Sequence, residues 1–169
     1  MELRSDLSKQ YLSEALLALL KKQDYNAITI QDIVEKAGLS RMAYYRNFHS
    51  KDEILKYYLD QITDFFILDQ QPQYDPKHFR DYALILFSHL SRQKELGGLL
   101  LKAGLIHFVR DEFNRIFDNK SSNEREHCHN CFLAGGLYNV YVRWLETGCK
   151  ASPEEIADML ADFFEGAAV

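Results

Sequence analysis

The chain has 169 residues, of which 47% are apolar and 27% are charged, and its formal net charge is −5. This composition supports a packed core without metals or disulfides and argues against a disordered chain. Residues 1–55 hold eight basic and eight acidic side chains, whereas the remainder holds 12 and 17. A neutral N-terminal part and an acidic remainder argue against non-specific binding of nucleic acid, although a small basic face that docks on phosphates is compatible with both.

Cysteine usage and the N-terminal sequence bear on the compartment. Three cysteines, Cys128, Cys131 and Cys149, and an N-terminal segment without an apolar core argue against a secreted disulfide scaffold. The longest apolar runs, such as residues 16–20, are too short to span a bilayer. We therefore expect a cytoplasmic protein.

Helical spacing of apolar residues dominates the chain, and strand-like alternation is absent, so we predict an all-α fold of about nine helices. A first helix is expected at about residues 5–22 and a second from Thr29, which forms a capping-box pattern with Asp32. Gly38 predicts a left-handed end to that helix. Ser40 is a good N-cap for a short third helix that ends near Arg46.

The remaining helices follow in order. A fourth, at about residues 50–69, begins with the capping-box residues Ser50 and Glu53 and precedes a linker at residues 70–76. Pro76 is expected to start the fifth helix. Three more are expected at about residues 94–102, 105–117 and 123–147. Ser152, followed by Pro153 and Glu155, predicts the start of the ninth.

The second and third helices, joined by a tight turn at Gly38, indicate a helix-turn-helix. The third helix carries polar and aromatic side chains, among them Arg41, Tyr45 and Asn47. A helix fits the major groove of DNA, where its N-terminal residues face the base edges. A helical hairpin packed in a core is the alternative, but these polar side chains would make a poor core.

The run from Ile30 to Leu55 resembles the DNA-binding domain of the TetR family of regulators. It contains an Ala-Gly-Leu-Ser turn at residues 37–40, a Tyr-x-x-Phe exit at residues 45–48 and a Ser-Lys start of the next helix at residues 50–51. The resemblance implies a three-helix DNA-binding head at residues 1–55. The fourth helix would link this head to a helical bundle at residues 56–169 that binds an effector and dimerises.

Position by position, the resemblance implies DNA contacts at eight residues: Thr29, Ser40, Arg41, Met42, Ala43, Tyr45, Asn47 and Lys51. Met42 stands where the family commonly has glycine, and Asn47 where it commonly has histidine or tyrosine. These two departures leave the base specificity open.

The C-terminal part resembles, at residues 132–157, a domain common in Gram-positive members of the family, which implies dimerisation. The helix at about residues 123–147 has two apolar faces, so we expect it to pack against two partners, its own core and a second chain. The dimer contacts that we expect are Leu137, Tyr138, Tyr141, Leu145, Met159 and Phe163. An effector cavity is expected at Tyr82, His107, Phe108 and Phe113, with plain core as the alternative for these aromatic residues.

His127, Cys128 and Cys131 place imidazole and thiol groups on one helix, a combination that suits zinc or a softer metal. The sequence leaves open metal binding, a redox response and ordinary helix surface, and we predict no metal and no cofactor. Because the chain lacks a glycine-rich phosphate loop and a nucleophile motif, we do not expect an enzyme.

We predict a sequence-specific transcription regulator, a repressor that a small-molecule effector releases from DNA. The expected partners are double-stranded operator DNA with a pseudo-palindromic sequence, a second copy of the chain and an unidentified effector, with no membrane. The alternative is a helical protein-interaction module or co-regulator that has lost independent DNA binding. The sequence leaves open the operator, the regulated genes, the effector and the sign of regulation.

Overall fold

The computed structural model describes residues 2–70, 75–118 and 123–165. Within these ranges the chain forms nine α-helices and two short 3-10 helices, with no strand, which confirms the predicted all-α fold. None of the described helices combines the length and the apolar character needed to cross a bilayer. The chain divides into two compact units, Met1–Ile62 and Thr63–Val169. The division falls within α4 (Lys51–Gln70), as does the boundary after residue 55 expected from the sequence.

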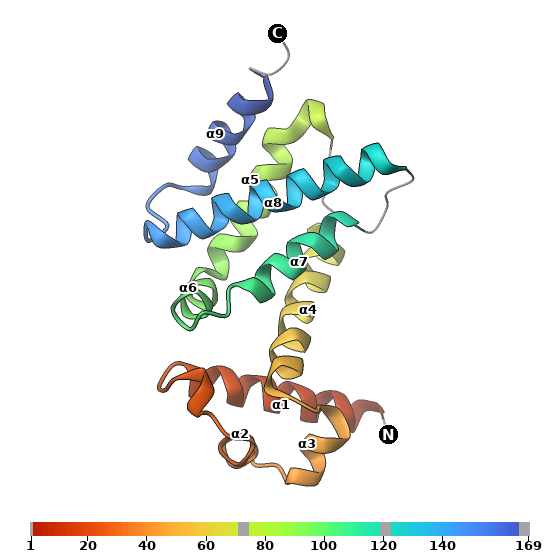
Figure 1. The fold of residues 1–169 in the computed structure, drawn as a ribbon, viewed down its shortest axis with the longest axis vertical. Helices are drawn as coiled ribbons and strands as arrows, with labels where there is room; N and C mark the ends of the chain where they lie inside the picture. Colours follow the sequence, from red (N-terminus) through yellow and green to blue (C-terminus); the bar gives the residue numbers. More distant parts are fainter. Residues whose placement is uncertain (1, 71–74, 119–122, 166–169) are drawn as a thin grey trace. The chain divides into compact units, whose positions relative to one another are not determined.

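The first unit is a small helical head. It contains α1 (Glu2–Leu20), the 3-10 helix η1 (Tyr25–Ala27), α2 (Ile30–Ala37), α3 (Arg41–Asn47) and the first part of α4. Helix α1 packs against both α2 and α3 (Figure 1). Residues four apart on a helix share a face, so Leu12 and Leu16 of α1 both point into the core, where Ile33 and Tyr44 are also fully buried.

The ends of α2 and α3 are fixed by the residues that the sequence indicates. Thr29 Oγ1 accepts a hydrogen bond from the amide of Asp32 at 3.1 Å, and the Asp32 carboxylate accepts one from the Thr29 amide at 2.8 Å. Gly38 ends α2 with φ of 66°, a conformation that costs glycine little. Ser40 Oγ accepts from the amide of Ala43 at 3.2 Å. The capping box of α2 and both caps around the turn are therefore confirmed.

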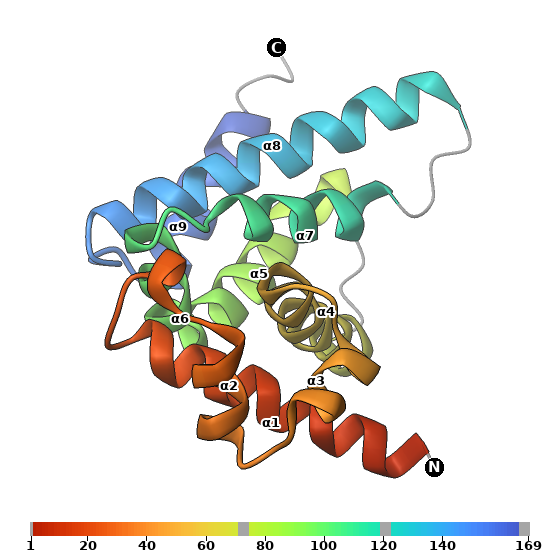
Figure 2. The same ribbon diagram turned by 60° about the horizontal axis from the view of Figure 1, so that its bottom comes forward.

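The second unit is a bundle built from α5 (Phe79–Arg92), α6 (Lys94–Lys102), α7 (His107–Asp118), α8 (Glu124–Glu146) and α9 (Pro153–Glu165). Helix α7 lies alongside α8 (Figures 1 and 2), and α5 packs against α9. The sequence predicted that Pro76 starts the fifth helix, and this prediction is wrong. Pro76–His78 instead form the 3-10 helix η2, at whose start the Asp75 carboxylate accepts a hydrogen bond from the amide of Lys77 at 3.0 Å, and α5 begins only at Phe79.

Helices α6 and α8 approach closely at Gly97. A Cβ atom added there would lie 2.1 Å from Tyr141 Oη, which is too close for any real contact. Tyr141 is buried and its ring packs near those of Phe113 and Trp144, with centroids 6.1 and 6.5 Å away. The absent side chain at Gly97 thus makes room for the hydroxyl of a core tyrosine.

Candidate nucleic-acid interface

Helix α3 buries one face in the head and exposes the other. Tyr44 and Phe48 are 0% and 4% exposed. Burial raises the pKa of the Tyr44 hydroxyl above its ordinary value, with smaller effects from Tyr45 and Glu53. On the opposite face, Met42 is 63% and Tyr45 54% exposed. The helix therefore presents part of its surface to solvent, and it carries two arginines and no carboxylate.

Arg41 is oriented by a residue of α2 that sequence reasoning missed. Its Nε atom donates a hydrogen bond to Gln31 Oε1 at 2.8 Å, and the Gln31 amide nitrogen donates in turn to Glu35. A guanidinium group has five donor hydrogens, so this bond leaves the two Nη groups available among the described residues. The spacing of Gln31 and Glu35, four residues apart on a helix, indicates the bond between those two side chains. The contact of Gln31 with Arg41 spans ten residues, so helical periodicity gave no signal for it.

Three of the predicted contact residues use their polar atoms to fix helix ends. Thr29 holds the start of α2, and its hydrogen bonds lower the pKa of the Asp32 carboxyl. Ser40 holds the start of α3. Asn47 Nδ2 donates to the carbonyl of Ala43 at 2.7 Å, one turn earlier. These residues set the direction of α2 and α3, and their direct contact with DNA stays a prediction.

Lys51 makes bonds inside the head. Its ammonium donates to the carbonyls of Tyr25 and Ile28 at 2.6 and 2.7 Å and lies 4.5 Å from the centroid of the Tyr25 ring. The Tyr25 hydroxyl donates to Asp52, and burial, followed by this bond, raises the pKa of that hydroxyl. An ammonium group has three donors. One donor of Lys51 thus stays available for a phosphate, and the first turn of α4 is tied to η1.

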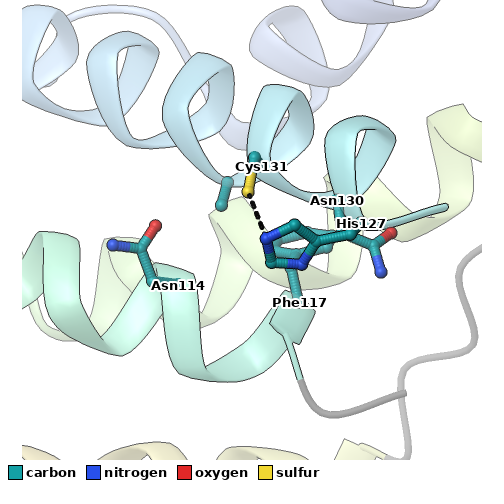
Figure 3. A pocket seen from close by; sticks show the side chains of 6 residues that line it. Asn114, Phe117, His127, Asn130 and Cys131 are labelled. Atoms are coloured by element: carbon teal, nitrogen blue, oxygen red, sulfur yellow. Dashed lines mark hydrogen bonds between the residues drawn. The ribbon is translucent and has the colours of Figure 1, made fainter. Parts of the chain in front are cut away.

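The four residues expected to line an effector cavity lie in different surroundings, and their role stays a prediction. Tyr82 and Phe113 are 3% and 2% exposed and belong to the core of the bundle. His107 is exposed, and its ring contacts the neighbouring ring of Phe108. A hollow of about 250 Å³ does lie between α7 and α8 (Figure 3), but other residues line it: Asn114, Phe117, His127, Asn130, Cys131 and Ala134.

The residues expected at the dimer interface fall into two groups. Leu137, Tyr141 and Leu145 are 2%, 2% and 9% exposed, which places them in the chain's own core, and Tyr138 is half-buried. Met159 and Phe163 on α9 are 48% and 73% exposed. These two side chains line an apolar groove of about 470 Å³ between α8 and α9, with Val140 and Trp144 among its other residues.

Ligands for a metal ion do not converge in the part of the chain that the structure describes. No group of three or more His, Cys, Asp or Glu side chains with suitable placement occurs there. His127 and Cys131 do approach each other, whereas Cys128 lies beside Glu124 instead.

Two short capped helices that meet at a left-handed glycine, the second with an exposed and carboxylate-free face, define a helix-turn-helix protein. Comparison with family models identifies the protein family. Residues 12–58 match the model of bacterial regulatory proteins of the tetR family, and residues 77–166 match that of a transcriptional regulator C-terminal region. The chain belongs to the TetR family of regulators, which is not a class of enzymes.

Relatives support this assignment. The chain is 27% identical over 159 residues to the uncharacterized HTH-type transcriptional regulator YxbF of Bacillus subtilis (strain 168), covering 86% of this chain and 42% of YxbF. It is 23% identical over 177 residues to YuxN, another uncharacterized HTH-type transcriptional regulator of that strain, covering 90% of this chain and 60% of YuxN. The chain thus spans less than two thirds of the length of either curated relative.

Two solved structures share the fold. A TetR transcriptional regulator from Streptococcus agalactiae 2603V superposes with a TM-score of 0.67 at 18% identity, covering 96% of each chain. The dihydroxyacetone kinase operon activator DhaS superposes with a TM-score of 0.62 at 15% identity, covering 95% of each chain.

Proposed function

We propose that the chain is a sequence-specific DNA-binding transcription regulator whose helix α3 enters the major groove. The observation that carries the proposal is the orientation of α3, with Tyr44 and Phe48 buried and Arg41, Met42 and Tyr45 exposed. The turn at Gly38 and the caps at Thr29 and Ser40 define where α2 ends and α3 begins, and they thereby orient the side chains that base recognition requires.

The exposed residues of α3 suit distinct parts of a DNA duplex. The Arg41 Nη groups can donate to a guanine edge, a contact worth about 1–3 kcal/mol of discrimination. Met42 offers an apolar surface for a thymine methyl group. The Tyr45 hydroxyl and the remaining donor of Lys51 are groups of the kind that contact phosphates and set the register. Arg41 thus contributes base specificity, and Tyr45 and Lys51 position α3 on the duplex.

The regulator acts as a homodimer in this proposal. Met159 and Phe163 are large apolar side chains exposed on α9 beside an apolar groove, and apolar residues of this kind mark interaction surfaces. A two-fold dimer carries two copies of α3, which read half-sites about 34–36 Å apart, so the operator is a pseudo-palindrome.

We propose that the regulator is a cytoplasmic repressor and that a small molecule bound in the second unit releases it from DNA. A ligand shifts such an equilibrium only by its different affinity for the free and DNA-bound states. Repression is the commoner mode in the family, and the structurally similar DhaS is named as an activator. A reporter driven by the bound promoter distinguishes repression from activation, since loss of the regulator raises expression from a repressed promoter.

The test of DNA binding is fluorescence anisotropy of the purified chain on duplexes tiled across the region upstream of its gene, at low and high salt. We expect tight binding of two protomers to one pseudo-palindromic tile, with affinity falling steeply in salt. The double variant Tyr45→Phe, Lys51→Ala weakens binding, whereas Arg92→Ala, an exposed arginine of the second unit, does not. Equal weak binding to every tile would contradict the proposal and favour a protein-interaction module.

A further inference from the structure

A histidine and a cysteine one turn apart on α8 meet at the hollow between α7 and α8. His127 Nε2 lies 3.7 Å from the Sγ atom of Cys131, and Cys131 is exposed. Figure 3 shows the imidazole and the sulfur turned toward each other, with Asn114 and Phe117 reaching the same space from α7. The hollow, of about 250 Å³, has room for a small organic molecule.

Cys128, three residues earlier on α8, has a different electrostatic setting. Its Sγ atom lies 3.8 Å from a carboxylate oxygen of Glu124, and it is also exposed. The thiolate is the nucleophilic form of cysteine, and a neighbouring imidazole that accepts the thiol proton promotes its attack. Of the two exposed thiols on α8, that of Cys131 has an imidazole nitrogen as its neighbour, whereas the neighbour of Cys128 is a carboxylate oxygen.

We propose that Cys131 is a covalent modification site for small α,β-unsaturated carbonyl compounds such as enals and quinones. His127 Nε2 takes the proton of the Cys131 thiol as the sulfur forms a bond to the β-carbon of the compound. The π electrons move onto the carbonyl oxygen, giving an enolate, and the proton held by His127 then passes to the α-carbon. The step is an addition, so no group leaves and no oxidant or reductant is consumed.

The lining of the hollow suits this class of compound. Asn114 and Asn130 bring amide groups, which can donate hydrogen bonds to a carbonyl or enolate oxygen. The Phe117 ring offers a flat apolar surface for a conjugated molecule. A reactive thiol, an amide donor and an aromatic surface around one small space recognise the three parts of an unsaturated carbonyl compound.

An adduct at Cys131 can affect helix α4 through an ion pair between α7 and α4. Arg115 follows Asn114 on α7, and its guanidinium donates to Asp64 of α4 at 2.7 Å and to Glu112 at 2.8 Å. Glu112 is only 7% exposed, so this ion-pair cluster is partly shielded from solvent. Because α4 runs from Lys51 to Gln70, a shift of α7 that strains the Arg115–Asp64 contact acts on the helix whose first turn belongs to the head. This second part rests on the proposed DNA binding.

The chemical part is tested with N-ethylmaleimide, an α,β-unsaturated imide, on full-length variants that each keep one of Cys128 and Cys131 in a Cys149→Ser background. Intact-mass spectrometry follows the adduct at neutral pH. We expect Cys131 to react at least about tenfold faster than Cys128, and His127→Gln to slow Cys131 by about tenfold without changing Cys128. Equal rates for the two thiols, or no effect of His127→Gln, would overturn the proposal.

The regulatory part is tested by anisotropy on the bound tile before and after modification. We expect adduct formation to weaken DNA binding by at least about tenfold, a typical coupling, in the chain that keeps Cys131 and not in Cys131→Ser. Selective modification that leaves DNA binding unchanged would refute this coupling. A failure of the unmodified chain to bind any tile would refute the proposed DNA binding instead, while the rates of the two thiols still decide the modification site.

Discussion

Gly97 and Gly98 are neighbours on α6 with opposite surroundings, which makes them a matched pair for testing the packing of α6 on α8. A Cβ added at Gly97 meets Tyr141 Oη at 2.1 Å and a Leu145 methyl carbon at 3.1 Å, whereas one added at Gly98 meets nothing within 4 Å. Alanine stabilises a helix interior by about 0.5–1 kcal/mol relative to glycine, so both substitutions gain this amount.

At Gly97 that gain is opposed by a steric cost. Tyr141 is confined by the rings of Phe113 and Trp144, so the added methyl group cannot be accommodated by a small rotation. Forcing a methyl group into a packed core costs about 1–3 kcal/mol. We therefore expect Gly97→Ala to lower the free energy of unfolding by up to about 2 kcal/mol, and Gly98→Ala to raise it by about 0.5–1 kcal/mol.

Urea denaturation followed by circular dichroism measures the difference between the two variants. The structure predicts that Gly97→Ala is less stable than Gly98→Ala by about 1–3 kcal/mol. Adding Tyr141→Phe to Gly97→Ala removes the nearest atom and should recover part of the loss, relative to Tyr141→Phe alone. Equal unfolding midpoints for Gly97→Ala and Gly98→Ala would refute the close approach of α6 to α8.

Three further outcomes follow from the structure. Thr29→Ala removes the N-cap of α2 and should lower the free energy of unfolding by about 1 kcal/mol, a loss that Thr29→Ser should largely avoid in the same urea titration. His89 is half-buried against Phe66, and burial lowers its pKa below the ordinary 6.5. The unfolded chain therefore binds a proton more readily there, and stability should fall as pH drops below about 6.5, a fall that His89→Leu should reduce in urea titrations at several pH values. Phe163→Glu should raise the dissociation constant of the dimer at least about tenfold in analytical ultracentrifugation, and an unchanged constant would exclude this surface of α9 as the interface.

Local signals in the sequence predicted the head well. Thr29, Gly38 and Ser40 act on backbone groups within a few residues, so their roles follow from residue type and spacing alone. The 3-10 helix at Tyr25–Ala27 was missed because three residues carry no periodicity. Its importance comes from Lys51, which bonds to it from 26 residues along the chain.

The helical bundle of the second unit was predicted less completely, for a physical reason. Periodicity shows which residues of α8 share a face, but whether that face covers the chain's own core or a second chain depends on the packing of distant elements. Leu137, Tyr141 and Leu145 accordingly lie in the core. A close approach of two helices occurs at Gly97, and periodicity could not indicate it because its partner Tyr141 is 44 residues away.

The central claim is that the exposed face of α3 reads DNA, and the most direct measurement is the affinity of Arg41→Ala for the bound tile and for an unrelated duplex. We expect a loss of about 1–3 kcal/mol, or roughly fivefold to 150-fold, on the tile, with a much smaller change on the unrelated duplex and none in the Arg92→Ala control. An Arg41→Ala variant that binds the tile as tightly as the unaltered chain, or that loses affinity equally for both duplexes, would contradict this claim.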